Sequence, residues 1–157
     1  MPTAEYSTLK GLRAATNSSL TAFSASEGER LRAIGSELEP VADVMHRFLL
    51  DSGKRLRPLF ALVGYLGSGL EITPAIVNAA ASLELVHVCA LMHDDVMDAS
   101  DTRRGAPSVH RAFEAMHRQK ALAGSDEQFG ISAAILLGDL ALIWSAKALQ
   151  QILYLRQ

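Results

Sequence analysis

The sequence predicts an all-α protein, and three observations lead to this prediction. Apolar residues recur at helical spacing over most of the 157 residues, and no stretch of useful length alternates with a period of two. No internal repeat appears. Apolar residues make up 49% of the chain and charged residues 20%, a composition that favours a packed core over disorder. We therefore expect one domain built as a bundle of helices.

Charge and cysteine content narrow the class of protein. The formal net charge of -2 gives no support for non-specific binding to nucleic acid. The single cysteine, Cys89, rules out an internal disulfide and fits a reducing compartment, so we expect a cytoplasmic location. Residues 1–19 lack the apolar core of a signal peptide. No uninterrupted apolar run reaches the roughly 18–20 residues that cross a bilayer, so no membrane span is expected.

The first third of the chain predicts a polar start followed by helices. Residues 1–26 are rich in Ser, Thr and Ala and predict a polar N-terminal arm or a short helix. Between 27 and 50 apolar residues recur at helical spacing, but Pro40 interrupts them, so we expect two helices or a kink. Asp, Ser and Gly at 51–53 are typical of a helix end.

Four more helices are expected in the rest of the chain. The first covers 58–66 and is broken by nearby glycines. Thr73 is a suitable N-cap before Pro74, and a long helix from there runs into an acidic stretch. Two further apolar patterns predict helices over 109–122 and 131–153.

The acidic stretch, residues 83–105, reads LELVHVCALMHDDVMDASDTRRG. If the helix runs that far, one of its stripes carries His87, Asp94, Asp98 and Asp101, with Asp95 one step round. Carboxylates crowded near a helix C-terminus repel one another and oppose the helix dipole. Two local rules broken together tend to mark a functional site.

A divalent cation would relieve both conflicts. Mg²⁺ takes one or two carboxylates and completes its shell with water and substrate phosphates. Arg103 and Arg104 follow the acidic residues, and the guanidinium fork matches phosphate oxygens. The pattern predicts a diphosphate site bridged by Mg²⁺. The alternative is a solvated helix end with internal Asp–Arg pairs, because short motifs also occur by chance.

A basic segment, GKRLRP at 53–58, precedes the predicted helix over 58–66. Lys54 and Arg57 are three residues apart and can point the same way. A helix N-terminus with nearby cations is suited to an anion, although a basic surface patch is the alternative. The helix dipole disfavours cations at this end, and a bound anion would remove that conflict.

Three motifs in this order resemble those of the trans-isoprenyl diphosphate synthases, or polyprenyl synthetases. They are GKRLRP at 53–58, LVHVCALMHDDVMDASDTRRGAP at 85–107 and LLGDL at 136–140. The resemblance covers nearly all of the chain after about residue 27 and is closest to short-chain, geranylgeranyl-type bacterial members. It implies a helical bundle of the isoprenoid synthase type.

The resemblance also implies a reaction and residue roles. An allylic diphosphate ionises, isopentenyl diphosphate attacks the cation, and loss of a proton leaves a chain longer by one isoprene unit. Asp94 and Asp98 resemble the Mg²⁺ ligands that hold the allylic diphosphate, with Asp95 in support, and Arg103 resembles the arginine that binds the same diphosphate. Four residues resemble those that bind isopentenyl diphosphate: Lys54, Arg57, His87 and Arg104.

Two small residues bear on product length. In the family, the hydrocarbon tunnel passes the positions of Cys89 and Ala90, and shorter-product members tend to carry bulky aromatics there. The resemblance therefore implies a product longer than farnesyl diphosphate, geranylgeranyl diphosphate being expected. The alternative is that small residues here only permit tight helix packing. Cys89 lacks the partners of a nucleophile and is interpreted as buried wall.

One departure leaves several hypotheses open. The family's second Asp-rich motif does not occur in these residues, so 27–157 resemble the N-terminal part of the helical domain, and the resemblance implies a truncated bundle. The leading hypothesis is a prenyltransferase fragment whose half of the metal clamp does not suffice for catalysis. The second is a non-catalytic partner subunit of a complete synthase. The third, a terpene cyclase, is disfavoured by GKRLRP and RRG. The resemblance also implies a homodimer.

Overall fold

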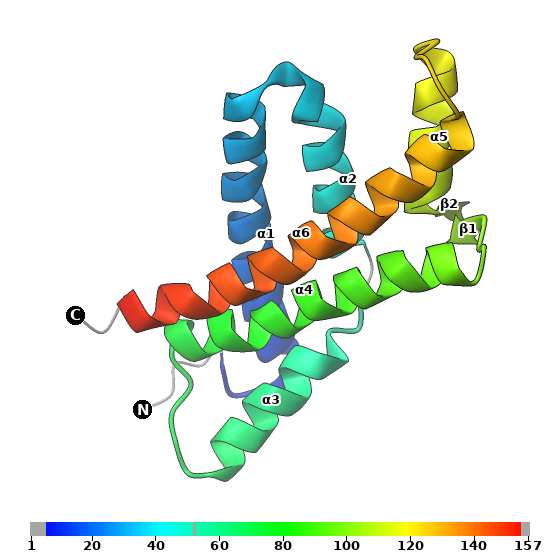
Figure 1. Ribbon diagram of the computed structural model, residues 1–157. Helices are drawn as coiled ribbons and strands as arrows, with labels where there is room; N and C mark the ends of the chain where they lie inside the picture. Colours follow the sequence, from blue (N-terminus) through cyan, green and yellow to red (C-terminus); the bar gives the residue numbers. More distant parts are fainter. Residues whose placement is uncertain (1–5, 52, 155–157) are drawn as a thin grey trace. The chain divides into compact units, whose positions relative to one another are not determined.

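The computed structural model describes residues 6–51 and 53–154, and this part of the chain is almost entirely helical (Figure 1). It contains six α-helices: α1 (Leu9–Ile34), α2 (Glu39–Leu50), α3 (Leu56–Gly67), α4 (Pro74–Met97), α5 (Val109–Gln119) and α6 (Asp126–Tyr154). A 3₁₀ turn, η2 (Ser36–Leu38), precedes α2. Two very short strands, β1 (Thr102–Arg103) and β2 (Ala106–Pro107), pair between α4 and α5. The all-α prediction is confirmed.

The chain divides into two compact units. The first unit consists of residues 1–86 and 143–157, and the second of residues 87–142. Helices α4 and α6 each contribute residues to both units.

Most of the predicted N-terminal arm or short helix belongs to the long helix α1, which corrects the sequence prediction for residues 9–26. Thr8 caps α1, because its side-chain oxygen accepts a hydrogen bond from the Gly11 amide at 3.0 Å. Leu12 and Leu20 are buried on one face of this helix. Thr16 satisfies its buried hydroxyl by donating to the Leu12 carbonyl at 2.8 Å. The apolar face of this helix is narrow, so its polar composition did not predict a helix. Residues 1–5 of the predicted arm lie outside the described part.

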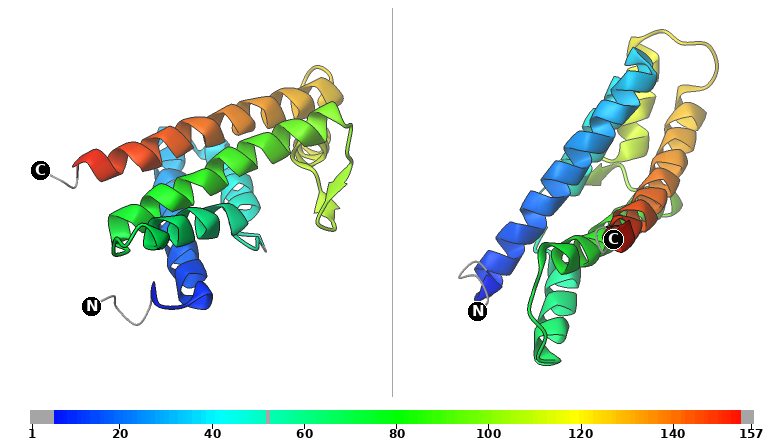
Figure 2. Two further views of the ribbon diagram at one scale, coloured as in Figure 1. Left: turned by 90° about the horizontal axis from the view of Figure 1, so that it is seen from below. Right: turned by 90° about the vertical axis from the view of Figure 1, so that its left-hand side faces the viewer.

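Two helices, α1 and α2, meet just before Pro40, as one of the two sequence alternatives predicted. Pro40 lies in the first turn of α2, where a missing amide hydrogen removes no helical hydrogen bond. The chain reverses through η2, and α1 and α2 lie side by side as a helical hairpin (Figures 1 and 2). Arg32 of α1 donates to Asp43 of α2 at 2.6 Å across this hairpin.

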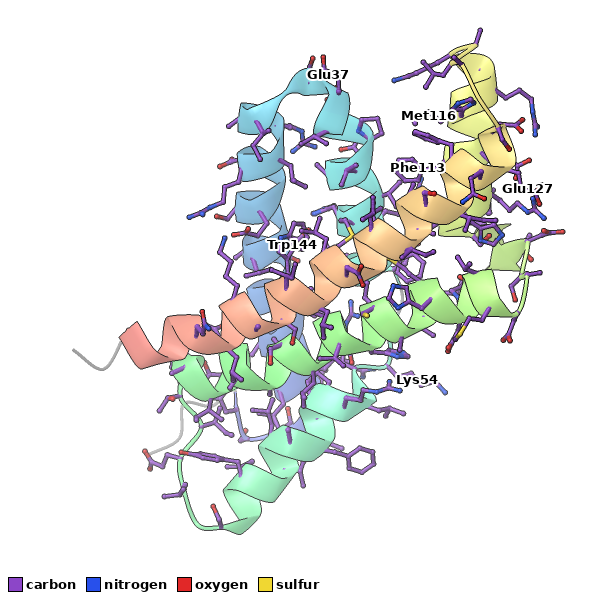
Figure 3. All side chains as sticks on the ribbon, viewed as in Figure 1. Glu37, Lys54, Phe113, Met116, Glu127 and Trp144 are labelled. Carbon is purple, nitrogen blue, oxygen red and sulfur yellow. The ribbon has the colours of Figure 1, made fainter. Side chains whose placement is uncertain are left out.

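One hydrophobic cluster of the first unit forms where α1, α3 and the start of α4 meet. Its buried members are all aliphatic: Leu12, Ala15, Leu62, Ile72, Val77 and Ala80. The last part of α6 joins this unit through Trp144, whose ring packs edge-on against Phe23 with centroids 5.9 Å apart (Figure 3). Lys147 donates to both carboxylate oxygens of the buried Glu27, at 2.6 and 2.7 Å.

The second unit is held together around α5 and the first half of α6. Phe113 of α5 packs against Phe129 of α6, with ring centroids 6.4 Å apart (Figure 3). Gly130 permits this close approach, because a Cβ there would overlap the His110 carbonyl oxygen. Helix α5 ends at Gln119, before the predicted 122. Helix α6 begins at Asp126 rather than at 131, since Ser125 accepts a hydrogen bond from the Gln128 amide at 3.2 Å.

Two helices meet a length and composition test for membrane spans, Pro74–Met97 and Asp126–Gln150. The expectation of no membrane span counted uninterrupted apolar runs and stays a prediction. In the most apolar 18-residue stretch of each helix, 50% of the α4 residues and 39% of the α6 residues are buried, and core helices of globular folds meet the same criterion.

Candidate functional site

The acidic end of α4 stops at a defined helix cap. Helix α4 ends at Met97, and Ala99 takes a left-handed conformation with φ 50°. The Ser100 amide reaches back to the Asp95 carbonyl at 2.9 Å, which is the bond that closes a Schellman cap. Asp98 therefore lies at the cap itself, with its amide still bonded to the Asp94 carbonyl at 2.8 Å.

This cap decides which carboxylates share a face. Asp94 and Asp98 are one helical turn apart and both are exposed. Asp101 lies beyond the left-handed residue, so the condition under which it would share the predicted stripe is not met. Its carboxylate instead accepts a hydrogen bond from the Arg111 side chain at 2.7 Å. The acidic stripe is therefore shorter than the sequence suggested.

The RRG segment is a β-hairpin, which sequence reasoning missed. Thr102 pairs with Pro107 and Arg103 with Ala106, leaving Arg104 and Gly105 as the two turn residues. Both have positive φ, 53° and 79°, as a type I′ turn requires. Figures 1 and 2 show the hairpin at the C-terminal end of α4. A glycine at the second turn position was the available signal.

The hairpin brings Arg103 onto Asp95. The guanidinium donates from Nε and Nη2 to the two Asp95 carboxylate oxygens, each at 2.8 Å. Asp95 is only 1% exposed, and a buried carboxylate without such a partner would be strongly destabilising. The hydrogen bond to Asp95 raises the pKa of Arg103, and the charges of Asp94 and Asp98 add to this effect.

The two remaining carboxylates could supply part of the coordination shell of a magnesium ion, and not a shell made of protein ligands alone. Asp95 has both oxygens on Arg103, which leaves the exposed Asp94 and Asp98 as the acidic donors. Among the described residues, no group of three or more His, Cys, Asp or Glu side chains is placed to hold a metal ion. Two carboxylates, completed by water and phosphate oxygens, are the donor set that Mg²⁺ accepts.

Three other predicted site residues lie on α4 or at the hairpin turn. His87 is half-buried on α4, seven residues and about two turns before Asp94. Arg104 is exposed at the hairpin turn, and Ala90 is exposed on α4. Their roles in substrate binding and chain length stay predictions.

Cys89 is buried, as expected for a wall residue. Burial raises the pKa of its thiol, and the nearby charge of Asp139 adds to the increase. The thiol sulfur lies 3.8 Å from His93 Nδ1, and a thiol with a raised pKa is a poor nucleophile. The interpretation of Cys89 as a wall residue without a catalytic role stays a prediction.

His93, to which sequence reasoning gave no role, joins α4 to α6. Its Nε2 lies 3.1 Å from the Ile135 carbonyl oxygen. A Cβ at Gly138 would overlap the His93 ring, so the glycine of LLGDL permits this contact. An isolated glycine within an apolar helix was a signal of close approach that could have been used.

The basic segment belongs to the first unit and precedes α3. Helix α3 begins at Leu56 rather than at 58, so Lys54 lies just outside the helix and Arg57 in its first turn. Both side chains are exposed, and Figure 3 shows Lys54 projecting from the segment before α3. The middle cation, Arg55, is buried and was missed. Its Nη1 lies 3.2 Å from Glu84 Oε2, and its Nε donates to Asn17 Oδ1 at 2.8 Å.

Comparison with known proteins identifies the family. Residues 39–157 match the family model of the polyprenyl synthetases. The chain belongs to the polyprenyl synthetase family.

Relatives of this polyprenyl synthetase include several enzymes with different product names. It is 32% identical over 124 residues to the short chain isoprenyl diphosphate synthase of Methanocaldococcus jannaschii, covering 79% of this chain and 33% of that protein. It is 37% identical over 87 residues to heptaprenyl diphosphate synthase component 2 of Geobacillus stearothermophilus, covering 55% of this chain and 27% of that one.

A solved structure is also similar. The geranylgeranyl pyrophosphate synthase of Corynebacterium glutamicum, complexed with isoprenyl diphosphate and magnesium, aligns with a TM-score of 0.85 and 41% identity. The alignment covers 92% of this chain and 42% of that chain. The present chain thus spans about a third or less of these two curated relatives and under half of the solved one.

Proposed function

We propose that this polyprenyl synthetase acts in prenyl transfer and carries the allylic-diphosphate site at the end of α4. One observation carries the proposal: Arg103 is fixed by its fork to buried Asp95, beside the exposed carboxylates of Asp94 and Asp98. The similar structure from Corynebacterium, which is complexed with isoprenyl diphosphate and magnesium, supports it. The family match favours this function over that of a terpene cyclase.

Each residue at this end of α4 has a distinct task in the proposal. Asp94 and Asp98 would hold Mg²⁺, which when bound neutralises the charge that develops on the departing diphosphate. Asp95 binds no ligand itself but orients Arg103. The fork involves Nε and Nη2, so the remaining nitrogen, Nη1, can donate to a diphosphate oxygen.

The basic residues are the proposed binding groups for the second substrate. We propose that Lys54 and Arg57 bind isopentenyl diphosphate, whose double bond attacks the allylic cation. The parts of His87 and Arg104 in this binding stay predictions. The exposure of Lys54 and Arg57 at the start of α3, where free amides favour an anion, supports this assignment. The cytoplasmic location and the homodimer stay predictions.

Calorimetry tests the acidic half of the site. Inorganic pyrophosphate titrated into the chain with Mg²⁺ should bind, and Asp94→Asn or Asp98→Asn should weaken binding by roughly tenfold or more because a metal ligand is lost. Asp101→Asn is the matched control, since Asp101 pairs with Arg111 and should leave affinity unchanged. Equal affinity with and without Mg²⁺ would contradict the proposed metal site.

Product length gives a second test. In an active full-length form, assayed with Mg²⁺, an allylic diphosphate and labelled isopentenyl diphosphate, we propose geranylgeranyl diphosphate as the product. Cys89→Phe should shorten it, because the aromatic ring fills space at a buried wall position, whereas Cys89→Ser should not. Chromatography of the labelled products measures the difference. An unchanged product in Cys89→Phe would remove the assignment of Cys89 to the tunnel.

A second candidate is a partner subunit of a complete synthase. One relative is named as a component of its enzyme, and α3 exposes large apolar side chains, Phe60 being 75% exposed. In that case the chain alone would give no product, and adding it to a complete synthase would change the rate or the product length. Labelled product from the chain alone would exclude this candidate.

A further inference from the structure

Arg55, the middle cation of GKRLRP, is built into the first unit instead of facing solvent. It is 5% exposed and reaches three neighbouring helices: it pairs with Glu84 of α4, donates to Asn17 of α1, and has Nη2 3.4 Å from the Leu50 carbonyl that ends α2. Glu84 is itself 4% exposed. A buried arginine is tolerated only when paired and hydrogen-bonded in this way.

The backbone around Arg55 is shaped to allow this burial. Arg55 is the N-cap of α3 and has a left-handed conformation with φ 54°, which L-residues adopt only when the surroundings impose it. A Cβ on Gly53 would lie 2.7 Å from Arg55 Nη1 and 3.2 Å from Cζ. The glycine of the motif therefore makes room for the guanidinium to fold back over the chain.

We propose that Arg55 is a positioning residue for the diphosphate-binding cations on either side of it. Its contacts with Glu84 and Asn17 fix the backbone from which exposed Lys54 and Arg57 project, so the two charges are presented together at the start of α3. This inference rests on the proposed binding of isopentenyl diphosphate by Lys54 and Arg57. It explains why three cations in four residues have two different environments.

Binding of inorganic pyrophosphate without metal tests the basic segment separately from the acidic one. By calorimetry at low salt, Arg55→Gln should bind about tenfold more weakly than the unchanged chain, the size of effect that outer partners of binding groups produce. Arg55→Lys should also bind weakly, because it keeps the charge but loses the fork. Arg32→Gln is the control, since it removes an arginine paired with Asp43 on the surface of the same unit.

A double-mutant cycle separates positioning from a direct or general electrostatic effect. In a Lys54→Ala/Arg57→Ala background, adding Arg55→Gln should change the remaining affinity by less than about twofold, because the groups that it positions are gone. The same tenfold loss in both backgrounds would overturn the proposal.

A variant that lacks both buried charges tests whether the weaker binding comes only from a loss of folding. The Arg55→Gln/Glu84→Gln variant avoids an unpaired buried charge and should regain thermal stability relative to Arg55→Gln, while its pyrophosphate affinity stays low. If the double variant regains both thermal stability and pyrophosphate affinity, Arg55 only stabilises the fold and does not position the binding residues. An unchanged chain that does not bind pyrophosphate would overturn the proposed role of Lys54 and Arg57, and this inference with it. If the unchanged chain and the Arg55 variants bind pyrophosphate with equal affinity, only the inference about Arg55 is overturned.

Discussion

At the scale of single residues, two alanines hold backbone conformations that usually belong to glycine. Ala99 after α4 and Ala121 after α5 have φ of 50° and 47°. In each case the next residue reaches back to a carbonyl in the last helical turn, Ser100 to Asp95 at 2.9 Å and Leu122 to His117 at 3.2 Å. Both helices therefore end in the same cap, and one of these caps sets the geometry of the acidic site.

Replacing these alanines by glycine should stabilise the chain. Relief of left-handed strain exceeds the extra entropy of glycine in the unfolded chain, so Ala99→Gly and Ala121→Gly should each add about 0.5 kcal/mol. Thermal unfolding followed by circular dichroism measures the gain. Ala115→Gly, in the middle of α5, should instead destabilise by about 1 kcal/mol. Destabilisation by all three substitutions would show that the two caps are not strained.

Sequence spacing predicted where some of the site residues lie, whereas the burial of others depends on tertiary contacts. The pairing of Asp94 with Asp98 on one helical face follows from their four-residue separation, and it could be predicted. The burial of Asp95 could not, because it depends on a hairpin that has no alternating pattern to reveal it. Arg55 escaped for a related reason: its partners Asn17 and Glu84 come from distant parts of the sequence.

At the scale of helices, glycines set how closely neighbouring helices approach. Gly130 faces backbone atoms of α5, which cannot move aside, whereas a Cβ added to Gly64 of α3 would have nothing within 4 Å. The two glycines are therefore a matched pair in which helix propensity is the same and packing differs.

The pair predicts opposite effects of one substitution. Gly130→Ala should destabilise by roughly 1–3 kcal/mol because α5 and α6 must separate. Gly64→Ala should stabilise by up to about 1 kcal/mol, since alanine is the better helix former. Urea unfolding of both variants gives the comparison, and a stabilising Gly130→Ala would contradict the close approach of the two helices.

A surface network of charges links α5 to the start of α6. Arg118 donates to Glu114 at 2.6 Å and to Asp126 at 2.7 Å, and Arg111 donates to Glu114 at 2.7 Å. The hydrogen bond from Arg111 lowers the pKa of Glu114, and the one from Arg118 lowers the pKa of Asp126.

The sign of these shifts predicts a pH dependence. A carboxylate whose pKa is lowered by folding stabilises the protein above its unfolded pKa, about 4, and this contribution disappears as the pH falls through the folded pKa. Glu114→Gln should therefore lower the melting temperature slightly at pH 7 and have no effect near pH 2. A difference that grows on acidification would contradict the assigned pairing.

At the scale of the whole chain, the helical pattern was predictable and its first element was not. Helical periodicity located α2 to α6 to within a few residues, because each carries apolar positions at regular spacing. The first helix was missed at residues 9–26, where buried Thr16 and Ser24 take core positions that a polar composition conceals. Caps such as Thr8 and Ser125, rather than periodicity, mark where the chain enters a helix.

The fork between Arg103 and Asp95 joins residues only eight positions apart. Closing so short a loop sacrifices little chain entropy, so this charged cluster can assemble from its own neighbourhood. Arg55 and Glu84, by contrast, are 29 positions apart and meet only once three helices have come together. The contacts of the acidic segment should therefore form at an earlier stage of folding than those of the basic segment.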